Sequence, residues 1–382
     1  MSVQELKKSK KYKIYLFIGR DKEGKAIRHC EIVYGGLKEA RDRENELKLQ
    51  LKEGNYIKKS NLSLEHLSKE YLELKKNTLT LKTYITYEQR VQVINDKIGN
   101  VKLKDLNVRI LEKFYSYLKN DYISGKTKNH ISNTTIQSYY CIINNMLEQA
   151  VKWDYLKNNP NSKIEKPKRE RKEIAVYSKD EVFKLLECIK NESLKYQAII
   201  YMALDLGCRE GELVALTWDD IDLSTRQVSI NKSIQVIGGR VIEKETKTAN
   251  SDRKIFISET TAQILKKYRK EQMKKKLLLG TKWGNSTRVF TTNLGNDIHH
   301  DTPYQILKKI IKKYELKDIS FHALRHTNAS LKIGAGIQPQ IISRSLGHSS
   351  IQITDKYYSH FFEEEFKDAS NIMEESIFSK VN

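Results

Sequence analysis

The chain has 382 residues, of which 69 are Lys or Arg and 48 are Asp or Glu, so its formal net charge is +21. A chain of this length exceeds one compact core, and we expect two or three domains. The basic excess favours a polyanionic partner, with nucleic acid ahead of an acidic membrane surface. Four cysteines without a CxxC pair exclude a disulfide framework and a zinc ribbon, and they fit the reducing cytoplasm. No apolar run is long enough to span a bilayer, so no membrane association is expected.

The basic excess is spread over the whole chain. Residues 1–60 carry 16 basic and 9 acidic groups, residues 61–170 carry 19 and 12, and residues 171–382 carry 34 and 27. A neutral enzyme with one basic tail would concentrate the excess in one segment. The even distribution therefore predicts that every part of the chain contacts the polyanion.

The first 58 residues have the pattern of a small sheet with one helix. Segment 11–18 is rich in aromatic and β-branched residues and predicts a strand, and 27–34 predicts its returning partner. Residues 21–24 between them are a turn signal, and 37–53 predicts a charged helix. We expect a β-sheet-plus-helix unit over residues 1–58.

The hydrophobic period changes to that of a helix near residue 62. Apolar side chains recur at helical spacing at Leu64, Leu67, Tyr71 and Leu74. Further helices are predicted at 80–97, 105–119 and 132–153. A helical domain is therefore expected over 62–165, followed by a charged linker over 161–172. The lysines and arginines of two of these helices are candidates for DNA contact, namely Lys82, Arg90, Lys97 and Lys152.

The third region, 172–382, is mainly helical with a small antiparallel sheet. Ser178 and Glu181 have the spacing of a capping box that starts a helix. Helices at 194–206 and 209–216 precede short strands predicted near 227–234, 240–243 and 253–257. The fold class expected for the whole chain is a multidomain α+β protein.

Two segments resemble motifs for cofactor binding but lack residues that such motifs need. Gly125, Lys126 and Thr127 resemble the end of a phosphate-binding loop, but Asn120 stands where that loop needs its first glycine. His322 and His326 have a zinc-like spacing, yet Arg325 between them would repel a metal ion. We therefore expect neither a nucleotide nor a metal cofactor.

Four segments of the C-terminal half carry the chemistry. In chain order they contain Arg209 and Glu212, Lys247 and Arg253, His322 and Arg325, and finally His348 followed by the pair Tyr357 and Tyr358. The order Arg, Lys, His-x-x-Arg, His and Tyr resembles the catalytic boxes of the tyrosine recombinase (phage integrase) family. The resemblance is specific across about 180–362. Upstream, the sheet-and-helix unit resembles the family's arm-type DNA-binding domain, and the helical region resembles its core-binding domain.

The residue types suit attack on a DNA phosphodiester. Two guanidiniums, Arg209 and Arg325, can hold the two non-bridging oxygens and neutralise charge as a metal would. Lys247 can protonate the leaving 5′-oxygen, His322 can accept the proton of the nucleophile, and His348 can hydrogen-bond the phosphate. A covalent intermediate conserves the energy of the phosphodiester bond, so no ATP is needed.

The nucleophile is one of two adjacent tyrosines. The family places it nine or ten residues after the histidine of the Leu-Gly-His segment, and Tyr357 and Tyr358 meet these two spacings. Many members read Tyr-x-His at the nucleophile, which only Tyr358 with His360 matches. We therefore expect Tyr358 to attack, with Tyr357 as the alternative.

The resemblance implies a site-specific integrase that inserts and excises a mobile element or prophage through a 3′-phosphotyrosine intermediate. Its expected partners are double-stranded attachment sites, three further copies in a tetramer on DNA, an excisionase and a host DNA-bending protein. It would act in the cytoplasm, at the nucleoid. A recombinase that resolves chromosome dimers, a type IB topoisomerase and a non-catalytic DNA-binding regulator are the alternatives. The unit at 1–58 disfavours the first two, and the complete set of catalytic residue types disfavours the third.

Overall fold

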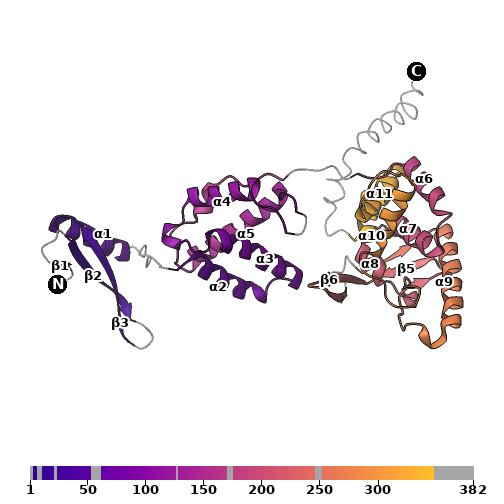
Figure 1. Cartoon of the computed structure of the whole chain (residues 1–382), viewed down its shortest axis with the longest axis horizontal. Coiled ribbons are helices and arrows are strands. Elements are labelled where there is room, and N and C mark those ends of the chain that lie inside the picture. The colour runs from indigo at the N-terminus through magenta and orange to yellow at the C-terminus, as the bar shows by residue number, and fades with distance from the viewer. Residues whose placement is uncertain are drawn as a thin grey trace, which may run out of the picture. The chain divides into compact units, whose positions relative to one another are not determined.

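A computed structural model describes residues 3–6, 11–20, 24–52, 62–125, 128–169, 175–245 and 252–347 (Figure 1). The chain divides into two compact units, residues 1–171 and 172–382. Within the described residues, no helix combines the length and the apolar character needed to cross a bilayer.

The N-terminal part of the first unit is a three-stranded antiparallel sheet with one helix. It consists of β1 (Val3–Glu5), β2 (Lys11–Arg20), β3 (Ala26–Tyr34) and α1 (Leu37–Lys52). The strand order is β1-β2-β3. Alternate residues of β2, Ile14 and Leu16, are buried together with Ala40 and Leu47 of α1, so the helix covers one face of the sheet (Figure 1). The predicted sheet-plus-helix unit is confirmed.

The rest of the first unit is helical, as predicted. It contains α2 (Leu64–Lys76), α3 (Leu81–Ile98), α4 (Val108–Asn120) and α5 (Asn133–Lys152), with 3₁₀ turns at Leu103–Asp105 and Pro160–Lys163. Its core includes Tyr71, Ile94, Phe114 and Ile143. The predicted stripe of α2 is buried as far as Tyr71, whereas Leu74 is 43% exposed.

The prediction of a linker that begins at residue 161 is wrong. Asn161 is completely buried, and its side-chain oxygen accepts a hydrogen bond of 2.6 Å from the hydroxyl of Tyr115. Gln137 donates to the carbonyl of Pro167 at 2.7 Å. Because buried polar groups must find partners, this basic and polar stretch packs against α4 and α5 instead of leaving the domain.

The second unit is built around α7 (Leu194–Leu206). This helix contacts α8 (Glu210–Ala215), α9 (Glu259–Leu279), α10 (Thr302–Lys313) and α11 (Phe321–Gly334) (Figure 1). The unit also contains α6 (Lys179–Ile189) and α12 (Pro339–Leu346). The predicted capping box of α6 is present. The Ser178 hydroxyl accepts from the backbone N–H of Glu181 at 3.2 Å, and the Glu181 carboxylate accepts from that of Ser178 at 2.7 Å.

Two small antiparallel sheets complete this unit. One has the order β4 (Ile221–Asp222), β5 (Gln227–Ile230) and β8 (Arg253–Phe256), and the other is the hairpin of β6 (Lys232–Ile237) and β7 (Arg240–Glu245). The single strand predicted at 227–234 is therefore wrong, because the chain leaves the first sheet at Asn231 and enters the hairpin. Gly238 and Gly239 form the hairpin turn with φ of +57° and +78°, which glycine adopts without a steric penalty.

Candidate active site

The turn between α7 and α8 brings the first arginine into place. Gly207 has φ of +57°, and a Cβ atom there would lie 2.7 Å from the side-chain oxygen of Asn328 and 2.6 Å from Leu346. The Asn328 amide of α11 donates to the last carbonyls of α7, at 2.6 Å to Leu204 and 3.0 Å to Asp205. These contacts satisfy carbonyls that a helix end leaves free, and they fix where α8 begins.

Glu212, three residues into α8, orients Arg209. One carboxylate oxygen accepts from Arg209 Nη1 at 2.7 Å, and the other accepts from the Arg209 backbone N–H at 3.0 Å. The second oxygen also accepts from Arg253 Nη2 at 2.7 Å. Burial alone would raise the pKa of Glu212, but Arg253 and Arg209 outweigh it and hold this pKa below its ordinary value. Glu212 is therefore an ionised carboxylate between two guanidiniums.

Arg325 on α11 is buried with one half of its guanidinium unpaired. Its Nη1 donates to the carbonyl of Gly207 at 3.0 Å, whereas its Nη2 is buried and has no hydrogen-bond partner among the described residues. Burial and then the charge of Arg209 lower its pKa to about 10. At neutral pH Arg325 is still a cation, so it presents an unsatisfied charged donor, which an anion would complete.

Two histidines flank Arg325 on the same helix. The rings of His322 and His326 meet edge to face, with centroids 5.0 Å apart. Partial burial, followed by the charges of Arg325 and Arg209, lowers the pKa of His322 below its ordinary value. A neutral imidazole at physiological pH can accept a proton, which suits the role predicted for His322.

The end of α12 is tied to two of the arginines. Arg253 Nε donates to the Ser345 carbonyl at 2.8 Å, and Arg209 Nη2 approaches the Gly347 carbonyl at 3.3 Å. His348 follows Gly347 directly in the chain. The segment that leads into the predicted histidine therefore starts beside Arg209.

The structure brings together three of the six predicted catalytic residues, namely Arg209, His322 and Arg325. The other three, Lys247, His348 and Tyr358, lie outside the described residues, as does the alternative nucleophile Tyr357. The described site holds three arginines and one glutamate, so it is strongly cationic and suited to a phosphodiester.

Arg253 belongs to this cluster, although the sequence predicted no catalytic role for it. Its side chain is 6% exposed. A signal was present in the sequence, because an arginine at the start of an apolar strand needs an acid to pair with in the interior. The sequence did not identify Glu212 as that acid.

Two family models match most of the chain. The model for the phage integrase family matches residues 176–365, and the model for the phage integrase SAM-like domain matches residues 55–164. A XerC-like tyrosine recombinase from Caldanaerobacter subterraneus subsp. tengcongensis is 30% identical over 91% of this chain and 92% of the relative. The chain belongs to the phage integrase family of tyrosine recombinases.

A further relative agrees with this assignment, and solved structures share the fold. The ICEBs1 integrase of Bacillus subtilis is 25% identical over 98% of this chain and 100% of the relative. A Tn1549 transposon integrase in complex with transposon right end DNA shares the fold at a TM-score of 0.67 and 19% identity, covering 82% of this chain and 99% of that chain. A lambda integrase tetramer bound to a Holliday junction has a TM-score of 0.57 and 16% identity, covering 93% of this chain and 94% of that chain. The recombinase is thus a site-specific integrase of the phage and mobile-element type, which breaks and rejoins DNA.

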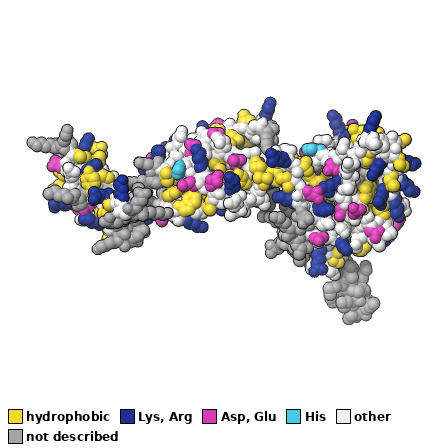
Figure 2. All heavy atoms as spheres, turned by 90° about the horizontal axis from the view of Figure 1, so that it is seen from below, with side chains coloured by type: hydrophobic (Ala, Val, Ile, Leu, Met, Phe, Trp, Pro, Cys, Tyr) yellow, Lys and Arg dark blue, Asp and Glu magenta, His cyan; other side chains and the backbone are white. Residues whose placement is uncertain are grey.

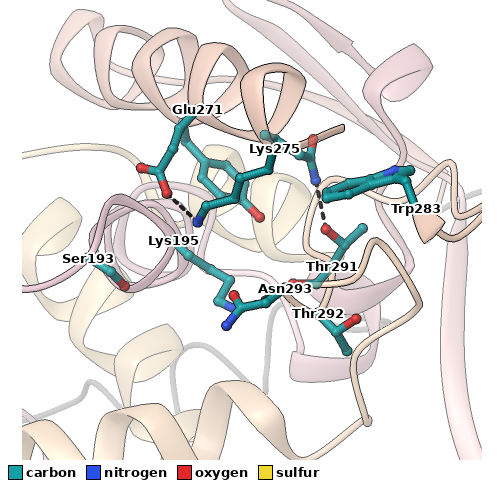
Figure 3. Close-up of a pocket in the computed structure, with 10 residues that line it drawn as sticks. Ser193, Lys195, Glu271, Lys275, Trp283, Thr291, Thr292 and Asn293 are labelled. Atoms are coloured by element: carbon teal, nitrogen blue, oxygen red, sulfur yellow. Dashed lines mark hydrogen bonds and ion pairs between the residues drawn. The ribbon is translucent and has the colours of Figure 1, made fainter. Parts of the chain in front are cut away.

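The pocket drawn in Figure 3 lies elsewhere in the same unit of the recombinase. It is lined by Ser193, Lys195, Tyr268, Glu271, Gln272, Lys275, Trp283, Thr291, Thr292 and Asn293. Lys195 donates to the Thr291 carbonyl at 3.3 Å, and Gln272 donates to the Thr291 hydroxyl at 2.9 Å. Lys275 pairs with Glu271 at 2.6 Å. Gln272 thus joins α9 to the loop that follows it, and Lys195 joins α7 to the same loop. None of the lining residues belongs to the active site.

Basic side chains are spread over the face of the recombinase that Figure 2 shows. On the face in Figure 2, Lys and Arg are scattered over every described part of the chain rather than gathered in one patch. Two of the basic residues predicted to contact DNA also pack on aromatic rings. The Arg90 guanidinium lies 5.8 Å from the ring centroid of Tyr139, and Lys97 Nζ lies 4.2 Å from that of Tyr117.

Proposed function

We propose that Arg209, Lys247, His322, Arg325, His348 and Tyr358 are the catalytic residues of this integrase. The observation that carries the proposal is the buried, unpaired Nη2 of Arg325, beside an Arg209 side chain that Glu212 orients and that is still 44% exposed. One guanidinium for each non-bridging oxygen would neutralise the phosphate as its charge develops in the transition state.

The reaction would then run in two steps. The Tyr358 oxygen attacks phosphorus while the bond from phosphorus to the 5′-oxygen breaks, which leaves a 3′-phosphotyrosine and a free 5′-hydroxyl. His322 accepts the tyrosine proton, Lys247 protonates the 5′-oxygen, and His348 donates a hydrogen bond to the phosphate. In the second step a 5′-hydroxyl of another strand attacks phosphorus and gives its proton to Lys247. The bond between phosphorus and the Tyr358 oxygen breaks, and His322 returns the proton to the tyrosine.

A division of labour along the chain is part of this proposal. Residues 1–58 would bind arm-type sites, residues 62–165 the core site, and residues 172–382 would carry out catalysis. The substrates would be double-stranded attachment sites at a mobile element and its target, reached at the nucleoid in the cytoplasm. Exchange of four strands needs four active sites, and we therefore propose a homotetramer on DNA, like the lambda integrase tetramer bound to a Holliday junction. An excisionase and a host DNA-bending protein would set the direction.

The decisive experiment measures the covalent adduct on a nicked suicide substrate. Tyr358→Phe removes one oxygen and little volume, so DNA binding should persist while the adduct disappears, because no neighbouring group replaces an in-line nucleophile. Tyr357→Phe is the matched control and should still form the adduct. The reverse result would assign the nucleophile to Tyr357. An adduct in both variants would remove the proposed mechanism.

A further inference from the structure

One buried guanidinium connects the segments that carry the proposed catalytic residues. Arg253 begins β8, and its Nη2 reaches Glu212 of α8 at 2.7 Å while its Nε reaches the Ser345 carbonyl of α12 at 2.8 Å. Its side chain is 6% exposed, so it does not present its charge to DNA as the 44% exposed Arg209 can. Arg325 is buried as well, but its Nη2 has no hydrogen-bond partner among the described residues, whereas Nε and Nη2 of Arg253 both donate to acceptors inside the protein.

The contact with Glu212 determines how Arg209 is held. Arg253 occupies the carboxylate oxygen that Arg209 Nη1 does not use. Without Arg253, that oxygen would keep only the bond from the Arg209 backbone N–H, and its second lone pair could accept from the Arg209 side chain. A two-pronged pair would then form, because arginine and carboxylate favour that geometry. Such a pair would draw Arg209 away from the scissile phosphate.

The contact with Ser345 determines where the chain emerges from α12. Ser345 lies three residues before His348, and Arg253 lies six residues after Lys247. Since Nε and Nη2 of a planar guanidinium point in different directions, one arginine can hold two acceptors from separate segments. A lysine ammonium at the same place would hold one of them well and the other poorly.

We propose that Arg253 is a positioning residue of the recombination reaction, which keeps Glu212 from capturing Arg209 and fixes the end of α12 ahead of His348. The proposal rests on the catalytic role proposed above for Arg209. It predicts that loss of Arg253 mimics loss of Arg209 in the chemical step, although Arg253 does not touch the DNA.

The test compares single-turnover adduct formation on two suicide substrates, one with a normal scissile phosphate and one with a methylphosphonate there. The methylphosphonate has one negative charge fewer, so its transition state depends less on a correctly placed guanidinium. The full-length variants are Arg253→Met, Arg253→Lys and Arg209→Ala. Tyr177→Phe is the control, because it removes a partly buried hydrogen bond of 2.8 Å to the Lys317 carbonyl without removing a contact to Glu212 or α12.

On normal DNA, we expect Arg253→Met to form the adduct about 100-fold more slowly than the wild type, a loss typical of a reacting group displaced by about 1 Å. Its affinity for core DNA should change less than about threefold, since Arg253 donates to Glu212 and Ser345 rather than to a phosphate. On the methylphosphonate, the deficits of Arg253→Met and Arg209→Ala should both shrink at least about tenfold. Tyr177→Phe should match the wild type on both substrates.

Arg253→Lys keeps the charge and carries the test if Arg253→Met does not fold. A folded variant with a near-normal rate, or with the same deficit on both substrates, would overturn the positioning role. If Arg209→Ala shows the expected pattern and the Arg253 variants do not, only the present inference is wrong. If Arg209→Ala itself cleaves normally, the catalytic assignment fails and this inference fails with it.

Discussion

His326 illustrates how a single residue behind the active site affects stability. It is 7% exposed, and burial, followed by the charges of His322 and Arg325, lowers its pKa to about 4. The unfolded chain binds this proton near pH 6.5, whereas the folded chain does so only near pH 4. Above pH 6.5 His326 is neutral in both states, and its contribution to the free energy of unfolding is at its maximum. As the pH falls from 6.5 toward 4, the unfolded chain alone takes up the proton, and this contribution is lost.

A substitution of His326 tests whether this residue makes the stability depend on pH. Between pH 7 and pH 5, proton uptake by His326 in the unfolded state should lower the free energy of unfolding by about 2 kcal/mol. His326→Gln cannot take up the proton, so its stability should depend on pH less steeply by that amount. Urea unfolding followed by tryptophan fluorescence at the two pH values measures the difference. Identical pH dependence in both proteins would contradict the assignment.

At the scale of elements, the packing of the β6–β7 hairpin on α8 depends on one glycine. A Cβ atom at Gly211 would lie 2.3 Å from the Ile234 carbonyl and 2.9 Å from the Ser233 hydroxyl, so β6 approaches α8 as closely as backbone allows. The hairpin ends at Glu245, two residues before Lys247. The position of the hairpin on α8 therefore determines where the segment that contains Lys247, the proposed general acid, begins.

Gly211→Ala should displace the hairpin and slow adduct formation by about 10- to 100-fold through the general acid. A substrate with sulfur at the 5′-bridging position should restore most of the rate, because a thiol, with a pKa of about 8.5, leaves without being protonated. Gly334→Ala is the matched control, since a Cβ there meets no atom within 4 Å. If the sulfur substrate does not restore the rate of adduct formation by Gly211→Ala, the hairpin does not act through the general acid.

At the scale of the whole molecule, the proposed division of labour separates binding of distal sites from catalysis. Deletion of residues 1–58 should abolish binding to arm-type sites, measured by gel shift or footprinting. Cleavage of a core suicide substrate should survive, because all proposed catalytic residues lie at or beyond Arg209. A truncated, folded protein that cannot cut core DNA under any condition would show that the N-terminal unit takes part in the chemistry.

Much of this architecture was predictable from the sequence because the signals are local. Alternation in β2, the helical period of α5 and the capping box of α6 each depend on residues a few positions apart, and all three are present in the structure. The order of catalytic residue types also identified the family, which the comparisons confirmed.

Long-range partners were decided only by the tertiary structure. Asn161 looked like the start of a linker until Tyr115, 46 residues earlier, proved to be its partner. Arg253 looked like an ordinary basic residue, yet it pairs with Glu212 across 41 residues and with Ser345 across 92. No local pattern specifies such pairs, because a charge chooses its partner only after the apolar core has brought distant segments together and removed the water that would otherwise solvate it.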